Sequence, residues 1–453
     1  MLLLSKDLVA QIKKQPTEQI IVTANRHDVS LLDVASNVLQ VSSDDLKLIE
    51  HQHVNQVMVR VPGGWISRGN GQEHLTAIRS PVLTGAGGCG AFFIAQDGIS
   101  LRAPGFCNAN QLFDANTEQA KSIEVLRGPA STLYGTNAVH GVLNVLTPNP
   151  SDQDQSEVSL NVGPHEYQRA MLSLVSNSLK HGFMLNANVT DDGGYADDSG
   201  FEQQKLNLIH QYQEGKWQVK SVLGLTNLEQ ETAGFIQGFE VYKNAQLKTQ
   251  NPNPEAFRDS QSMRAYSQIK FNQDVDTSLT ITPYLRWTDM QFLQHYVPWQ
   301  PLEENGHTSI GAQVQYVKEY ADVTWLSGID LDYTQGELTE TQAQAFSPTL
   351  PAGIHYDYQV DASVYSPFAQ LKWAATSQLD LSVGARFERT KYVYDNRLTN
   401  GSACAIGVEN CRFTRPEDQE VKYHQWAYQV NASYTLATNQ KLYAQYSTGY
   451  RAQ

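Results

Sequence analysis

The amino-acid sequence predicts a mainly β fold: a transmembrane antiparallel β-barrel whose lumen holds a smaller N-terminal α+β domain. Three observations predict this fold class. From residue 151 onward, apolar and polar residues alternate with a period of two. The alternating segments run for about 10–14 residues, which is enough to cross a bilayer and longer than the roughly five or six of globular strands. The connections between them alternate between short and long.

The strands are clearest where apolar side chains occupy one face and polar or charged ones the other. Segments 183–190, 279–287 and 379–388 show this division, and similar segments recur along the chain. We expect about 13 strands in all, out of the roughly 22 that close a barrel large enough to hold a domain. A membrane barrel requires two such faces, because one meets lipid and the other meets a wet or filled lumen.

The connections give the orientation of the strands. Short turns are expected at SLKHG, QEGK, QDVDT, KEYAD, ATSQ and ATNQ, and long loops at 191–203, 230–261, 291–306, 335–358 and 395–420. Only the first hairpin, at GPHEY, is short where a long loop is expected. Short turns at one end and long loops at the other are typical of an up-and-down membrane barrel. A soluble all-β domain with one polar face remains the alternative.

The N-terminal third lacks this period-two alternation. Short β-like runs such as IIVTA and GVLNVLT are mixed with segments that we expect to be helical, at 37–61 and 110–125. The polar stretch TPNPSDQDQS then reads as a boundary. We therefore expect an N-terminal extension at 1–17, an α+β domain at 18–150 and the barrel at 151–453.

Composition excludes several classes of protein. The net charge of −14 argues against a nucleic-acid partner, because phosphate binding needs a basic surface. No run approaches the roughly 18 apolar residues of a membrane helix. No arrangement of nucleophile and base suggests an enzyme, and no cofactor is expected. We expect no metal site, and we expect His51 and His53 on a solvated face, because a third ligand is not nearby.

The four cysteines fall into two local pairs, Cys89 with Cys107 and Cys404 with Cys411. Neither pair has the spacing of a metal site. An even number in two short-range pairs favours two disulfides and an oxidising compartment. Four unrelated buried thiols are the alternative.

The segment Ile123–Thr147, IEVLRGPASTLYGTNAVHGVLNVLT, resembles the plug signature of TonB-dependent outer-membrane receptors. The residues that carry this resemblance are Arg127, Gly128, Pro129, Tyr134, Gly135 and Gly141, together with Arg79 in an upstream Ala-Ile-Arg strand. Ser80 stands where the family usually has Gly. The resemblance implies a plug domain inside a barrel in the bacterial outer membrane. In such a plug, Arg127 is expected to pair with carboxylates on the inner barrel wall or to stabilise the plug's own fold.

The family couples transport to an energised inner-membrane partner through a short N-terminal segment, the TonB box. Here EQIIVTA resembles that box. Its residues are Glu18, Gln19, Ile20, Ile21, Val22, Thr23 and Ala24. Extended β-branched residues suit strand addition to the edge of a partner's sheet. The alternative is that this segment is simply the first strand of the plug.

Ligands of the family are scarce and large: ferric siderophores, haem, cobalamin and some glycans. The resemblance implies binding between the long loops and the plug apex. We expect the segment Cys89–Cys107 to form this apex. The ligand-binding residues that we expect there are Arg102, Phe106, Phe235, Phe239, Tyr242, Tyr296 and Trp299. An iron chelate is the expected cargo. The competing hypotheses are a passive porin or adhesin barrel, and a secreted β-rich carbohydrate-binding or hydrolytic protein.

Both ends of the chain fit a fragment of such a receptor. The N-terminus, MLLLSKDLVAQIKK, does not have the pattern of a secretory signal. About 13 strands fall short of closure and leave unpaired edges. We therefore expect that a signal and about 200 C-terminal residues lie outside this sequence.

Overall fold

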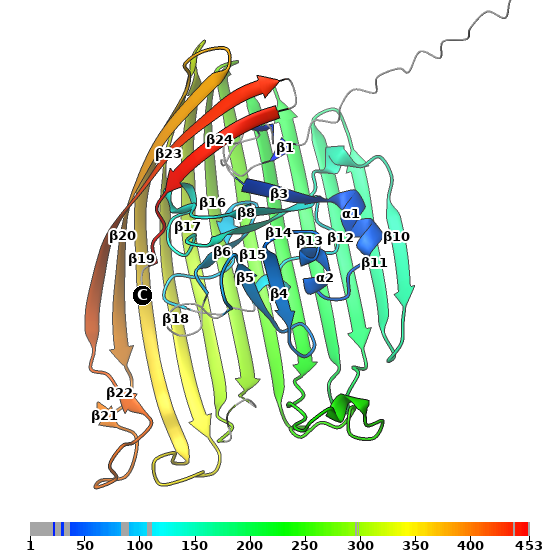
Figure 1. The fold of residues 1–453 in the computed structure, drawn as a ribbon, viewed down its shortest axis with the longest axis vertical. Helices are drawn as coiled ribbons and strands as arrows, with labels where there is room; N and C mark the ends of the chain where they lie inside the picture. Colours follow the sequence, from blue (N-terminus) through cyan, green and yellow to red (C-terminus); the bar gives the residue numbers. More distant parts are fainter. Residues whose placement is uncertain are drawn as a thin grey trace, which may run out of the picture.

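A computed structural model describes residues 21–22, 29–30, 37–82, 90–106, 111–294, 297, 299–437 and 440–451. It consists of a large curved antiparallel sheet whose concave face surrounds a smaller domain (Figure 1). The sheet is formed by residues 157–447, and the smaller domain, here called the plug domain, is formed by the residues before it. None of the described helices is long and apolar enough to cross a membrane.

The large sheet has 13 strands that pair in sequence order, as expected. They are β10 (Glu157–Val162), β11 (Gln168–Asn177), β12 (His181–Asp192), β13 (Phe201–Glu214), β14 (Trp217–Glu231), β15 (Phe257–Asp274), β16 (Thr277–Leu293), β17 (Leu302–Glu319), β18 (Val323–Gln342), β19 (Gly353–Ala374), β20 (Leu379–Asn396), β23 (Gln419–Ala437) and β24 (Gln440–Ser447). Most are longer than the predicted 10–14 residues, and β19 reaches 22. The long loops are correspondingly shorter than expected, because the strands continue into the segments that were expected to be loops.

The predicted faces of the strands are confirmed. In β12, Met184, Asn186 and Asn188 are buried toward the plug domain, whereas Phe183 and Val189 are exposed on the outside. The same alternation places Arg286 of β16 and Glu388 of β20 inside. The long loops lie at one edge of the sheet, where β21 (Gly401–Ser402) and β22 (Thr414–Arg415) form a small hairpin, and the short turns lie at the other (Figure 1).

The plug domain is built on a five-stranded mixed sheet in the order β3-β8-β9-β6-β7. Its strands are β3 (Asn37–Ser42), β8 (Ser122–Arg127), β9 (Gly141–Leu146), β6 (Phe92–Gln96) and β7 (Ile99–Ser100). A hairpin of β4 (Gly64–Arg68) and β5 (His74–Ile78) and the helices α1 (Ser43–Ile49), α2 (Asn55–Met58) and α3 (Ser131–Tyr134) complete it, with short 3-10 turns η3 (Gln111–Asp114) and η4 (Pro150–Asp152). Its core includes the fully buried side chains of Val57, Ile78, Val125 and Leu143.

The two predicted helical segments are largely wrong. Residues 37–42 form β3 because they pair with β8, with Asn37 opposite Arg127. Helix α1 begins only after Ser42, whose hydroxyl accepts from the Asp45 N–H while the Asp45 carboxylate accepts from the Ser42 N–H. It ends after about two turns, where Glu50 adopts the left-handed conformation. In 110–125 the helical pattern gives only η3, followed by β8.

Candidate functional site

Ion pairs join the plug domain to the inner wall of the barrel. Four plug carboxylates face four cations on β13, β14 and β15. The pairs are Glu118–Lys205 at 3.0 Å, Asp97–Lys220 at 3.2 Å, Glu73–Arg258 at 3.0 Å and Asp114–Arg264 at 3.7 Å. All eight side chains are less than a fifth exposed. We call this set the ionic seam.

The strength of these pairs differs. Burial alone would raise the pKa of Glu118, but Lys205, with His51 and Arg169, lowers it to about 2, so the carboxylate is ionised at neutral pH. Burial instead raises the pKa of Asp114, because Arg264 stands farther away and compensates only in part. Glu118–Lys205 is therefore a firmer contact than Asp114–Arg264.

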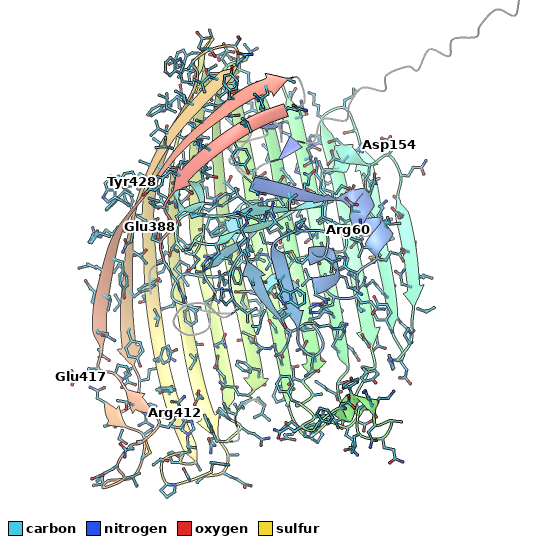
Figure 2. The ribbon with its side chains drawn as sticks, in the orientation of Figure 1. Arg60, Asp154, Glu388, Arg412, Glu417 and Tyr428 are labelled. Carbon is cyan, nitrogen blue, oxygen red and sulfur yellow. A yellow bond between two sulfur atoms is a disulfide. The ribbon has the colours of Figure 1, made fainter. Side chains whose placement is uncertain are left out.

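Wall arginines also bind the plug backbone. Arg286 of β16 donates to the carbonyls of Ser100 at 2.7 Å and Arg102 at 3.1 Å. Arg386 of β20 donates to the carbonyl of Leu133 at 3.2 Å and pairs with Asp330 at 2.8 Å. Figure 2 shows the neighbouring Glu388 on the same wall strand. These contacts fix the plug by polar groups that water can replace.

The plug signature lies against this wall. Gly135 has φ +78°, and a Cβ there would stand 2.5 Å from Glu388 Oε2 and 2.9 Å from Arg386 Nη2. Gly141 also has no room for a side chain, because a Cβ there would lie 2.3 Å from the Leu126 carbonyl oxygen. Tyr134 is 4% exposed and packs against other plug side chains. The glycines thus permit the close approach that their resemblance to the signature implies.

Arg127 does not make the predicted pairing with the barrel wall. Its guanidinium donates to the Asn37 side-chain oxygen, at 2.9 Å from Nε, and to the Pro62 carbonyl, both within the plug domain. The β3–β8 register brings Asn37 opposite Arg127 and so decides its partner. Of the two predicted roles, stabilising the plug's own fold is the one that fits. Arg79 is exposed beside it, and Gly128 and Pro129 follow it in the turn toward α3.

The plug apex meets a group of tyrosines on the inner wall, which we call the tyrosine cluster: Tyr358, Tyr392, Tyr394 and Tyr423 of β19, β20 and β23. Rings of Tyr358 and Tyr394 lie 5.0 Å apart, and those of Tyr392 and Tyr423 lie 6.1 Å apart. A Cβ on Gly105 of the apex would lie 3.3 Å from the Tyr392 ring. The cluster therefore faces the plug.

Phe106 and Arg102 of the apex have different environments. Phe106 stacks on His307 of β17, with ring centroids 5.8 Å apart. Arg102 is 5% exposed, and its guanidinium donates to the carbonyls of Gly90 and Phe92. This burial lowers the pKa of Arg102 to about 10. Arg102 therefore stabilises the plug domain. Its contact with a ligand stays a prediction, and its burial does not favour that contact.

The predicted loop residues fall in two different long loops. Phe235, Phe239 and Tyr242 are 76%, 95% and 68% exposed in the connection after β14. Trp299 lies in the next long loop, with the Arg412 guanidinium 5.9 Å from its ring. Tyr296 lies outside the described residues. Among the described residues, Phe235, Phe239 and Tyr242 thus belong to one long loop and Trp299 to another.

Two of the long loops are joined near Arg412, which Figure 2 shows at the loop edge of the sheet. The Arg412 N–H donates to the Thr349 carbonyl at 3.1 Å, and the His355 and Phe413 rings stack with centroids 3.6 Å apart. The predicted disulfide between Cys404 and Cys411 is present in this connection. The predicted Cys89–Cys107 bridge lies outside the described residues.

Most of the proposed TonB box, Glu18–Ala24, also lies outside the described residues. Its described part, β1 (Ile21–Val22), pairs with β2 (Val29–Ser30) in a two-stranded ladder.

The expectation for His51 and His53 is wrong. Both are buried, at 2% and 0% exposed. Burial lowers the pKa of each to about 4. His51 bonds Thr117, and His53 bonds Asn55 and the Glu73 carbonyl. Among the described residues, no group of three His, Cys, Asp or Glu side chains could hold a metal ion.

Sequence reasoning missed the tyrosine cluster and the ionic seam. The period-two pattern could have found two of the tyrosines, because Tyr392 and Tyr394 share the inner face of β20 with Arg386 and Glu388. The partners of the wall cations come from irregular plug segments, where the sequence has no such periodicity.

Comparisons with known proteins agree with this architecture. Residues 112–453 match the family model of the TonB dependent receptor-like beta-barrel, and residues 30–142 match that of the TonB-dependent receptor plug domain. The vitamin B12 transporter BtuB of Vibrio vulnificus (strain CMCP6) is 27% identical over 375 residues, which is 77% of this chain. The chain spans 57% of the length of that relative.

Solved structures show the same fold. The ferric-catecholate import receptor Fiu from E. coli K12 aligns with a TM-score of 0.73 at 14% identity, over 93% of this chain and 71% of that one. The ferric yersiniabactin uptake receptor FyuA from Yersinia pestis aligns with a TM-score of 0.71 at 15% identity, over 92% and 66%. The plug and barrel family models, which together cover most of the sequence, establish that the chain belongs to the TonB-dependent receptor family of bacterial outer-membrane proteins.

Proposed function

We propose that this chain forms the plug and wall of a receptor that takes up a scarce, large nutrient by an energised step. The observation that carries this proposal is the ionic seam. Buried apolar contacts also join plug and wall, such as that of Phe113 with Phe201 and Leu228, but the ion pairs and hydrogen bonds of the ionic seam can be exchanged for water when the plug is pulled. A passive porin or adhesin has no use for a removable plug.

The energy would come from a TonB-type partner in the inner membrane that binds Glu18–Ala24. The run of β-branched residues from Ile20 to Thr23 supports strand addition. Scrambling Glu18–Ala24 should abolish uptake while leaving ligand binding to cells unchanged. Uptake that persists after scrambling would favour the passive barrel. Recovery of the protein in the soluble fraction without detergent would favour the secreted alternative.

The ligand is proposed to bind between the tyrosine cluster, Phe106 and the long loops. Phenol rings provide flat apolar surface with a hydrogen-bonding edge, which suits a large chelate that carries both apolar and polar groups. A ferric siderophore is our first proposal, as expected from the sequence. Cobalamin is the second, and the specific observation that favours it is the sequence similarity to a vitamin B12 transporter.

Equilibrium binding to outer-membrane vesicles would separate these ligands. The panel comprises a ferric catecholate, ferric citrate, haem, cobalamin and an oligosaccharide. Saturable binding of one ligand, weakened by cleavage of the long loops, would support the proposal. Binding of an iron chelate alone supports the first ligand, and binding of cobalamin alone supports the second. Failure of every ligand to bind saturably would contradict the proposed site.

A further inference from the structure

The outer face of the barrel wall carries a hollow of about 850 Å³ across β11–β17. Its lining residues all belong to these wall strands, and none belongs to the plug domain, so the hollow opens away from the lumen. Leu174, Phe183 and Leu208 on its lining are 46%, 55% and 40% exposed. Its size falls within the roughly 300–1,000 Å³ of small-molecule sites.

The strand register explains the shape of the hollow. One row across the outer face is almost entirely aliphatic: Leu174, Leu185, Leu208, Leu223, Ala265, Leu285 and Ile310 lie opposite one another in turn. The adjacent row runs through Ser176, Phe183, His210, Ser221 and Ser267. The short side chains of Ser221 and Ser267 leave space beside the long leucines, and this space is the hollow.

The hollow lies toward the end of the barrel that carries the short turns. Ser176 is the last residue but one of β11, and Phe183 is the third of β12. Ser221 is the fifth residue of β14. In outer-membrane barrels the short turns face the periplasm. The hollow therefore adjoins the periplasmic leaflet of the membrane.

Polar groups border the hollow on a face that otherwise meets hydrocarbon. The hydroxyls of Ser221 and Ser267 hydrogen-bond each other at 2.7 Å, and Nδ1 of His181 and Nε2 of His210 do so at 3.0 Å. A pair of hydroxyls or of neutral imidazoles that shares one hydrogen bond keeps a second donor for another acceptor. Hydrocarbon offers no acceptor, but the ester and phosphate oxygens of a phospholipid do.

Cations stand at the same edge. The short turn between β15 and β16 carries Asp276, whereas Lys180 lies in the turn between β11 and β12, where it pairs with Glu214, and Lys216 lies in the turn between β13 and β14. The two lysines are the cations nearest the adjacent rows of the hollow. They place positive charge at the level where a phospholipid phosphate would lie.

We propose that this hollow binds one glycerophospholipid of the periplasmic leaflet. An acyl chain fills the hollow along the leucine row, and the ester or phosphate oxygens accept hydrogen bonds from the serine and histidine pairs. The site is continuous with the lipid-facing surface of the barrel, so a soluble ligand does not reach it. The inference rests on the outer-membrane location of the family and is independent of the transported ligand.

The test is native mass spectrometry of the receptor after delipidation in detergent and titration with phosphatidylethanolamine. The wild type should retain one lipid. Filling the hollow with Ser221→Leu together with Ser267→Leu should reduce retention at least tenfold, and His210→Phe should reduce it several-fold. Ala385→Leu, on the outer face of β20 and away from the hollow, should leave retention unchanged.

Folding is checked independently by the protease resistance of the wall strands, which all variants should keep. Should the doubly substituted variant lose this resistance, His210→Phe alone decides the outcome. Equal lipid retention by the wild type and the folded hollow variants would overturn the proposal. So would a photo-crosslinker at position 221 that captures another protein in place of lipid. Neither result bears on transport, so failure of this proposal is distinguishable from failure of the proposed function.

Discussion

Lys205 of β13 and Glu118 of the plug domain form an ion pair of 3.0 Å in which the side chains are only 2% and 4% exposed. The two residues are 87 positions apart in sequence. Near them lie His51, whose carbonyl accepts from Arg169 of β11 at 2.7 Å, and Arg264 of β15, which faces Asp114. The plug is thus held at its side by charges that are desolvated only while it is docked.

Breaking this pair should loosen the plug. Glu118→Gln leaves the Lys205 ammonium buried without its counter-charge, which costs about 3–5 kcal/mol. We expect the urea concentration that exposes the plug to protease in vesicles to fall. Glu157→Gln is the matched control, because the 2.8 Å Lys47–Glu157 pair also joins plug to wall but is 58% and 53% exposed. Its loss should cost under about 1 kcal/mol. Equal effects of the two substitutions would contradict the assigned role of the ionic seam.

Gly135→Ala should destabilise plug docking more than Gly98→Ala. Both glycines have positive φ, +78° and +81°, so an alanine is strained at either position, and Gly135, with ψ −148°, lies in a backbone region that essentially only glycine adopts. Only at Gly135 would the new Cβ meet wall atoms, at 2.5 Å from Glu388 Oε2, whereas at Gly98 nothing lies within 4 Å. Thermal unfolding of the two variants measures the difference. The prediction fails if Gly98→Ala is the more damaging change.

The plug should lose stability as the pH falls from about 6.5 toward about 4. His51 and His53 are neutral in the folded plug because burial lowers the pKa of each to about 4. In the unfolded chain they titrate near 6.5, so the unfolded state binds more protons in this window and is favoured by acid. Each histidine should contribute on the order of 1 kcal/mol per pH unit. Urea unfolding between pH 7 and pH 4.5 measures this slope.

His51→Gln should flatten this slope, because it removes one of the buried plug histidines, which also include His74, whose pKa burial lowers to about 3. A separate loss is expected below pH 4.5. There the unfolded chain protonates Glu118, while the folded plug, with a Glu118 pKa of about 2, keeps it ionised. A pH slope that is the same in His51→Gln and the wild type would refute the assignment to His51.

Tyr392→Ala should weaken ligand binding if the tyrosine cluster forms the site. The loss of one stacked aromatic contact should cost on the order of 1–2 kcal/mol, about a tenfold rise in Kd. Tyr428→Ala is the control, since Tyr428 lies on the outer face of β23 and is 49% exposed (Figure 2). Binding isotherms in vesicles compare the two. A larger effect from Tyr428 would place the ligand elsewhere.

Reduction should affect the long loops. Cys404 and Cys411 close a short loop in the connection between β20 and β23. Removing this disulfide should lower the free energy of unfolding of the loop by roughly 2–3 kcal/mol, because the unfolded loop is no longer constrained. We expect Cys404→Ser with Cys411→Ser to make residues 397–418 more sensitive to protease while the barrel stays intact. The proposed Cys89–Cys107 bridge is tested by thiol labelling. Labelling of both residues in the native, oxidised protein would disprove it.

The sequence by itself determined the barrel wall. Period-two alternation is a local property that survives in each strand separately, so it gave the 13 strands, their two faces and the order of short and long connections. The plug signature could also be recognised from the sequence, because it is a contiguous motif. Its glycines are required where the backbone approaches other atoms closely, as Gly141 approaches the Leu126 carbonyl.

Only the tertiary structure decided which groups meet across the lumen. Glu118, Asp114 and Glu73 lie in plug segments without periodicity, and the wall cations that they face depend on how the plug is seated. The same holds for Arg127, which pairs with Asn37 because β3 joins β8, although residues 37–42 carry a helical pattern. Contacts between residues many positions apart depend on the packing of whole elements, and a local pattern carries no information about that packing.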